Sequence, residues 1–82
     1  MNIYVGNLSY QAEEGELRQL FEAFGEVVKV TIIRDRDTGR SKGFGFIEMA
    51  EEDAGSKAIK ELDQSAFLGR NVKINEARPR NY

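Results

Sequence analysis

The chain has 82 residues, of which 40% are hydrophobic and 32% charged, and its formal net charge is −2 at pH 7. This length fits one compact domain, and the composition excludes a disordered segment or a coiled coil. The absence of cysteine and histidine excludes disulfides, thiolate catalysis and zinc sites built from those residues, and it removes the usual general base at neutral pH. No apolar run approaches the roughly 18 residues of a membrane span, and the first residues lack the features of a secretion signal.

Residues 1–26 predict a strand followed by an amphipathic helix. Residues 3–5 form a short alternating apolar run that ends at Gly6, as in a strand. Apolar residues then recur at the helical spacing i, i+3, i+4 and i+7, namely Leu17, Leu20, Phe21 and Phe24. Ala12 stands where a capping side chain belongs, so we expect this helix to start frayed. Gly25 follows the stripe, where a left-handed C-terminal cap is expected.

The remaining residues predict two strands, a helix and a final strand. Residues 27–34 are rich in β-branched side chains and predict a strand. Residues 35–41 predict a turn-forming loop, and residues 42–49 predict the next strand. A second helical stripe follows three acidic residues and consists of Ala54, Ala58, Ile59 and Leu62. Residues 67–77 predict the last strand, in which apolar Val72 and Ile74 alternate with polar residues.

The order β-α-β-β-α-β predicts an α+β fold, the ferredoxin-like sandwich. Right-handed crossovers place both helices on one face of a four-stranded antiparallel sheet and leave the other face bare. Strand alternation assigns each side chain to one face. The inward set is Ile3, Val5, Val28, Val30, Ile32, Gly45, Ile47 and Met49. The outward set is Tyr4, Lys29, Thr31, Ile33, Lys42, Phe44, Phe46 and Glu48.

Three aromatic rings, those of Tyr4, Phe44 and Phe46, are therefore expected on the bare face. Exposed rings interleaved with cations suit single-stranded nucleic acid, because bases stack on the rings while the cations neutralise phosphates. Glycines beside the rings would let a base approach the backbone. The alternatives are that the rings cover a helix that the pattern does not show, or that they contact another protein.

Residues 42–49, Lys-Gly-Phe-Gly-Phe-Ile-Glu-Met, resemble the octamer K/R-G-F/Y-G/A-F-V-x-F/Y of the RNA-recognition motif. Met49 departs from the aromatic residue of that pattern, on the inward side, where it should change packing more than RNA contact. Residues 3–8, Ile-Tyr-Val-Gly-Asn-Leu, look like the family's companion hexamer on the first strand. The resemblance implies a single RNA-recognition domain over 1–82, with 77–82 as a C-terminal extension.

The same resemblance implies roles for individual residues. Tyr4 and Phe44 should stack successive bases, Phe46 should lie between two sugars, and Lys42 should contact a phosphate. Asn7 belongs to the hexamer and is a further candidate. The segment 75–80 looks like the part of the family that lies over RNA, and it adds the candidates Asn75, Arg78 and Arg80.

Charge is distributed unevenly, which bears on the low pI of 5.1. Residues 13–26 carry a net charge of −4 and residues 51–63 one of −3, whereas residues 34–42 sum to +2 and residues 70–80 to +3. The acidic helices are thus expected behind the sheet, and the basic residues at its front and edges, where local potential attracts phosphate. Further candidate RNA contacts are Lys29, Arg34, Arg40 and Lys73.

Two other classes of function compete with RNA binding. An enzyme would need a nucleophile paired with a base or a phosphate-binding loop, and Gly43-x-Gly45 is followed by Glu48 where a further glycine is required. The sequence therefore predicts no catalysis, no cofactor and no metal ion. A protein–protein interaction module with little RNA affinity is the stronger alternative, with the acidic helix face as the surface for a protein partner.

We therefore expect a monomer that binds single-stranded RNA, or single-stranded DNA, and that has no membrane partner. Post-transcriptional regulation or RNA chaperoning is the expected role. The chain looks like the small stand-alone bacterial members of the family, which implies a cytoplasmic location, although an organellar protein or an excised domain would look the same.

Overall fold

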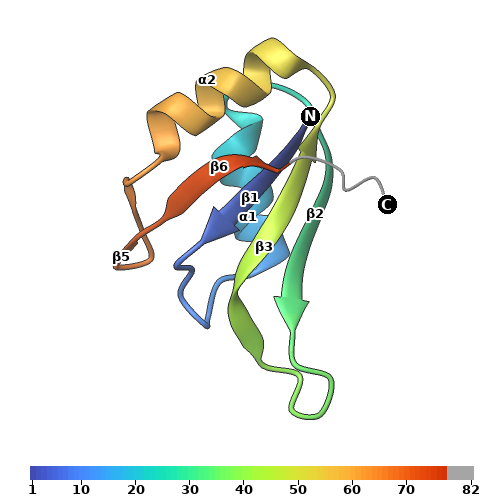
Figure 1. Cartoon of the computed structure of the whole chain (residues 1–82), viewed down its shortest axis with the longest axis vertical. Coiled ribbons are helices and arrows are strands. Elements are labelled where there is room, and N and C mark those ends of the chain that lie inside the picture. The colour runs from blue at the N-terminus through green and yellow to red at the C-terminus, as the bar shows by residue number, and fades with distance from the viewer. Residues whose placement is uncertain (78–82) are drawn as a thin grey trace.

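The computed structural model describes residues 1–77, which follow the order expected from the sequence with a small hairpin added before the last strand (Figure 1). The elements are β1 (Asn2–Gly6), α1 (Glu14–Glu22), β2 (Val27–Arg34), β3 (Ser41–Met49), α2 (Glu52–Leu62), β4 (Ala66–Phe67), β5 (Arg70–Asn71) and β6 (Lys73–Ala77). Within residues 1–77, neither helix has the length and apolar character needed to cross a membrane.

The main sheet has four strands in the order β2-β3-β1-β6, and each strand is antiparallel to its neighbours. The strands that carry the two family-like segments, β1 and β3, are therefore adjacent at the centre of the sheet. Figure 1 shows both helices on the same side of this sheet. The predicted ferredoxin-like α+β fold is confirmed.

The hydrophobic core lies between the sheet and the helices. Its fully buried members include the inward strand residues Ile3, Val5, Ile47 and Ile74, with Leu17 and Phe21 from α1 and Ala58 from α2. Leu20 and Phe24 pack against this core from partly exposed positions. Burial of this apolar surface is the main driving force for folding, and it fixes which face of each strand remains free.

The prediction of one strand over residues 67–77 is wrong in its first half. Residues 66–71 form the hairpin β4-β5 instead, in which Ala66 pairs with Asn71. Leu68 and Gly69 have positive φ angles of 52° and 83°, and positive φ at both central residues is what a tight hairpin turn requires. The last strand joins the main sheet only from Lys73 onward.

The alternation expected in β2 is also interrupted. Val27 pairs with Met49 and Lys29 pairs with Glu48, so β2 uses two residues where β3 uses one. This extra residue makes a β-bulge. Val27 is 6% exposed, whereas Val28, which was expected inward, is 49% exposed. From Lys29 to Ile32 the register with β3 is regular, and a second irregularity follows between Ile32 and Arg34.

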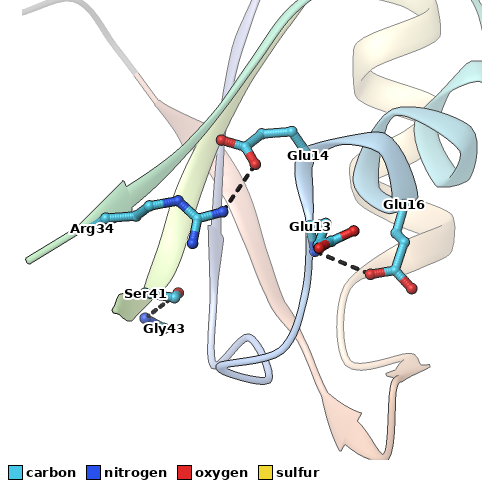
Figure 2. Close-up of polar contacts among 6 residues, drawn as sticks. All are labelled: Glu13, Glu14, Glu16, Arg34, Ser41 and Gly43. Carbon is cyan, nitrogen blue, oxygen red and sulfur yellow. Dashed lines mark hydrogen bonds and ion pairs between the residues drawn. The ribbon is translucent and has the colours of Figure 1, made fainter. Parts of the chain in front are cut away.

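Both ends of α1 differ from the expectation. Glu13 is the N-cap residue, and its backbone N–H donates a 3.0 Å hydrogen bond to Oε1 of Glu16 (Figure 2). This contact belongs to a capping box, which satisfies a free donor at the helix start. The expectation that Ala12 occupies the cap position is therefore wrong. Gly25 has a negative φ and is not a left-handed cap. A Cβ at Gly25 would lie 2.6 Å from the Cβ of Ala54, so this glycine permits the close approach of α2.

Candidate nucleic-acid interface

Three aromatic side chains, Tyr4, Phe44 and Phe46, form a cluster on the sheet face opposite the helices. Tyr4 of β1 pairs with Phe46 of β3, and their ring centroids are 5.8 Å apart at an interplanar angle of 62°. The Phe44 ring lies 6.1 Å from that of Tyr4 and 6.3 Å from that of Phe46. The rings are partly exposed, while the inward neighbours Ile3 and Ile47 are fully buried. The outward orientation predicted from alternation is confirmed.

Cross-strand pairing arranges the neighbours of this aromatic cluster in two rows. The first row crosses the sheet from β2 to β6 as Thr31, Phe46, Tyr4 and Asn75. The second row runs in the same direction as Lys29, Glu48, Asn2 and Ala77. Directly paired residues share a face of the sheet, so Lys29 and Asn75 lie on the face of the rings. Lys73, two residues before Asn75, also lies there.

A shallow hollow of about 340 Å³ lies in the second row, beside Phe46. It is lined by Asn2, Lys29, Thr31, Phe46, Ile47, Glu48 and Ala77. The carboxylate of Glu48, the ammonium group of Lys29 and the amide of Asn2 therefore line the same hollow as the Phe46 ring. A base held in this hollow would meet groups able to hydrogen-bond its polar edge.

The Tyr4 ring lies over Gly6, two residues along the same strand. A Cβ at Gly6 would be 2.5 Å from the hydroxyl oxygen of Tyr4 and 2.8 Å from its Cε2. Residues two apart on a strand point to the same face, so any side chain at position 6 would compete with the ring for this space. Gly6 thus allows the ring to lie along β1 with its other face turned outward.

The missing side chain of Gly45 is required by the packing of β3 against β2, and not by the approach of a ligand. A Cβ at this position would collide with the carbonyl oxygen of Thr31 in β2. Gly45 is buried and its partner in β2 is Ile32, so its missing side chain lets β2 and β3 pair closely. The sequence-based expectation that the glycines open the backbone to a base is therefore wrong for Gly45.

Asn7, a candidate RNA contact, is engaged by contacts within the chain. Its Nδ2 donates a 2.7 Å hydrogen bond to the carbonyl oxygen of Asn71, and its Oδ1 accepts one of 2.6 Å from Arg70. These bonds tie the end of β1 to the hairpin β4-β5. The Asn7 amide is therefore a structural link beside the aromatic cluster.

Arg34 is also paired. Its Nη2 lies 3.1 Å from Oε1 of Glu14 (Figure 2), which connects the end of β2 to the start of α1. The backbone N–H of Glu14 and the Arg34 guanidinium hold the pKa of this carboxyl below its ordinary value of 4.5, because both favour the charged form. Both side chains are partly exposed, so the pair contributes little to stability.

The loop between β2 and β3 is ordered by its own hydrogen bonds. Oδ1 of Asp35 accepts bonds from the backbone N–H groups of Asp37 (2.8 Å) and Thr38 (3.2 Å). These donors, and then the nearby charge of Lys42, hold the pKa of Asp35 below its ordinary value of 3.8. Arg40 and Lys42, which follow this turn, are exposed at the end of the sheet.

Comparison with known proteins identifies the family. Residues 3–73 match the model of the RNA recognition motif. The chain belongs to the RNA recognition motif family. The resemblance seen in residues 3–8 and 42–49 is thereby confirmed, and the second segment supplies two of the three clustered rings.

Relatives and solved structures agree with this assignment. A Nostoc sp. protein named "Putative RNA-binding protein RbpD" is 49% identical over 98% of this chain and 85% of its own length. The crystal structure of RNA Binding Protein PG1 superposes with a TM-score of 0.94 at 46% identity and covers 100% of this chain and 99% of that one. A Sex-lethal protein–RNA complex superposes with a TM-score of 0.91 at 32% identity, covering 98% of this chain and 48% of that one.

The structure groups some of the candidate residues and separates others. Tyr4, Phe44, Phe46, Lys29, Lys73 and Asn75 share one face, with Lys42 at the edge of that face. Asn7 and Arg34 are held by partners of their own. Arg78 and Arg80 lie outside the described residues. Sequence reasoning missed Asn2, whose pairing with Glu48 could have been found from the register of the two family-like segments.

Proposed function

We propose that this chain binds single-stranded RNA on the exposed face of its main sheet. The observation that carries the proposal is the cluster of Tyr4, Phe44 and Phe46 on the two central strands, with ring centroids about 6 Å apart and no helix covering them among the described residues. Each base that stacks on such a ring contributes about 1–3 kcal/mol to binding. The RNA-binding names of the relatives support this function.

In this proposal each member of the surface has a separate role. Tyr4 and Phe44 stack successive bases, and Phe46 packs between two sugars. Lys42, Lys29 and Lys73 neutralise phosphates, and Asn75, in the row of Tyr4, offers hydrogen bonds to a base edge. Arg40 adds positive charge at the loop.

Charge placement supports the same orientation of the ligand. The acidic helices α1 and α2 lie behind the sheet (Figure 1), so the phosphate chain is attracted to one face and repelled from the other. The family assignment agrees with the expectation that the chain is not an enzyme. The protein-binding alternative has no comparable support, since the relatives named above are described by RNA binding.

We further propose that the chain acts as a monomer in the cytoplasm, in post-transcriptional regulation or RNA chaperoning. The bacterial relative supports this location. Single-stranded DNA should bind as well, because stacking on a ring does not require the 2′-hydroxyl. The acidic helix face stays available for a protein partner.

The experiment is a titration of fluorescein-labelled random-sequence RNA followed by anisotropy. Phe44→Ala should weaken binding by about 5- to 150-fold, the equivalent of one stacked base. Leu68→Ala is the matched control, because Leu68 is an exposed apolar residue (46%) in the β4-β5 turn, which carries none of the three rings. Equal affinity of the two variants for RNA would refute the proposed function.

A further inference from the structure

Tyr10 is the most exposed large hydrophobic side chain of the described residues, at 68%. Tyr10 belongs to neither family-like segment, and it lies outside the hydrophobic core. A ring that leaves two-thirds of its surface in water gains little from folding. Burial in the core therefore does not account for the position of the Tyr10 ring.

The loop that carries Tyr10 is anchored on both sides. Leu8 and Ala12 are each 1% exposed. The backbone N–H of Leu8 donates a 2.9 Å bond to the carbonyl of Gly43, and the N–H of Ala12 donates a 3.0 Å bond to the carbonyl of Ser9. Tyr10 thus lies at the top of a turn held between two buried residues, so its exposure is a feature of ordered structure.

The Tyr10 ring lies beside Gly43 of β3. A Cβ at Gly43 would be 3.3 Å from Cε1 of Tyr10 and 3.9 Å from its Cδ1. Gly43 has a φ of +85° and directly precedes Phe44. The structure therefore places a fourth aromatic ring at Gly43, the residue before Phe44, close to the loop between β2 and β3.

Beside this ring lies a cleft of about 720 Å³ that carries positive charge. It is lined by Tyr10, Arg34, Asp35, Thr38, Gly39, Arg40, Ser41 and Lys42. The Asp35 carboxylate accepts backbone hydrogen bonds of its own loop, and Arg34 also contacts Glu14. Within residues 1–77, Arg40 and Lys42 form no ion pair. An exposed ring next to free cations is the combination that holds a base together with its phosphate.

We propose that Tyr10 is a fourth base-stacking platform, and that the cleft between it, Arg40 and Lys42 holds the phosphate of the same nucleotide. This inference rests on the proposed RNA binding by the three-ring face. It makes the binding surface longer, running from the hollow beside Phe46, across Tyr4 and Phe44, to the β2–β3 loop. The chain should then engage more nucleotides than the three rings alone can contact.

The test is a length series of labelled random-sequence RNA, from about two to ten nucleotides, titrated against the unaltered chain, Tyr10→Ala and Tyr10→Phe. On the shortest RNA all three should bind alike. On RNA long enough to reach residue 10, Tyr10→Ala should bind about 5-fold or more weakly, whereas Tyr10→Phe should keep the affinity, because stacking needs only the ring. Identical length dependence for the unaltered chain and Tyr10→Ala overturns the inference.

Two further measurements separate the possible failures. Phe44→Ala should weaken binding at every length; if it does not, the proposed function fails, whatever Tyr10 does. Photocrosslinking of the unaltered chain to RNA that contains 4-thiouridine needs no variant, so it remains informative if Tyr10→Ala misfolds. A crosslink mapped by peptide fragmentation to Tyr10 supports the inference, and crosslinks confined to Tyr4 or Phe44 contradict it.

Discussion

The Tyr4 ring occupies the space that a side chain at Gly6 would need, with the hydroxyl oxygen 2.5 Å from the position of a Cβ on Gly6. The far end of a side chain can move, so an alanine at position 6 would displace the ring and leave the strand intact. A stacking platform depends on the orientation of its ring. Gly6 therefore acts on RNA binding through Tyr4.

Gly6→Ala should accordingly weaken RNA binding while changing the free energy of unfolding by less than about 1 kcal/mol. Tyr4→Ala should weaken binding by about 1–3 kcal/mol. In the double variant, the alanine at position 6 should have no further effect, because the ring it displaces is absent. A double-mutant cycle on RNA affinity measures this coupling, and additive effects would show that Gly6 acts independently of the ring.

Phe46→Ala should lower RNA affinity, and Leu17→Ala should lower stability. Phe46 is 38% exposed on the sheet face, so its truncation should lower RNA affinity with a stability change within about 1 kcal/mol. Leu17 is fully buried against the sheet, and its truncation should lower stability by about 2–5 kcal/mol with normal affinity per folded molecule. Leu20, in the same helical stripe, is partly exposed, so Leu20→Ala should lower stability by less than Leu17→Ala does. Melting curves and RNA titrations of each variant check this, and unfolding by Phe46→Ala would place that ring in the core.

RNA binding should depend on salt with a log–log slope near −2, as expected for about three neutralised phosphates on a single strand. Lys42→Ala should reduce the slope by about 0.7. Lys57→Ala is the matched control, since Lys57 is an exposed lysine on α2, behind the sheet. Titrations at several salt concentrations provide the slopes. A slope near zero for the unaltered chain would remove phosphate contacts from the mechanism.

Stability should fall with decreasing pH in a range set by Glu14. Its pKa in the folded state is lowered from 4.5, so its stabilising effect is present above this value and is lost as the pH falls through the folded-state pKa. Glu14→Gln should make the loss of stability below pH 4.5 shallower. Urea unfolding at neutral pH and at several lower pH values tests this, with Glu52→Gln, an exposed helix residue, as the control. Parallel curves for Glu14→Gln and the unaltered chain would contradict it.

Glu48 should influence which base is held beside Phe46. Its carboxylate lines the hollow with Asn2 and Lys29, and a carboxylate accepts a hydrogen bond from the amino group of cytosine. Oligocytidine should therefore bind more tightly than oligouridine, and Glu48→Gln should reduce this difference, because an amide can also donate to uracil. Competition titrations with the two oligomers measure the ratio, and an unchanged ratio would exclude a role for Glu48 in base choice.

The sequence predicted those parts of the site that follow from strict alternation. Tyr4, Phe44 and Phe46 could be placed because their neighbours along each strand form the core. When one set of alternating side chains is buried, the other set must lie on the opposite face. Val28 could not be placed, since two consecutive valines do not show where a strand gains a residue. The partners of Asn7 and Arg34 lie 64 and 20 residues away in the chain. Local patterns contain no information on such contacts.

The bulge in β2 has a consequence for how copies of the chain meet one another. β2 is an edge strand of the main sheet, and a regular, apolar edge can pair with the edge of a second molecule. At Val28 the hydrogen-bonding pattern is irregular, and the next residue, Lys29, is an exposed cation. Both features disfavour strand addition by another copy. The irregularity that the sequence pattern failed to predict thus protects the sheet against aggregation through this edge.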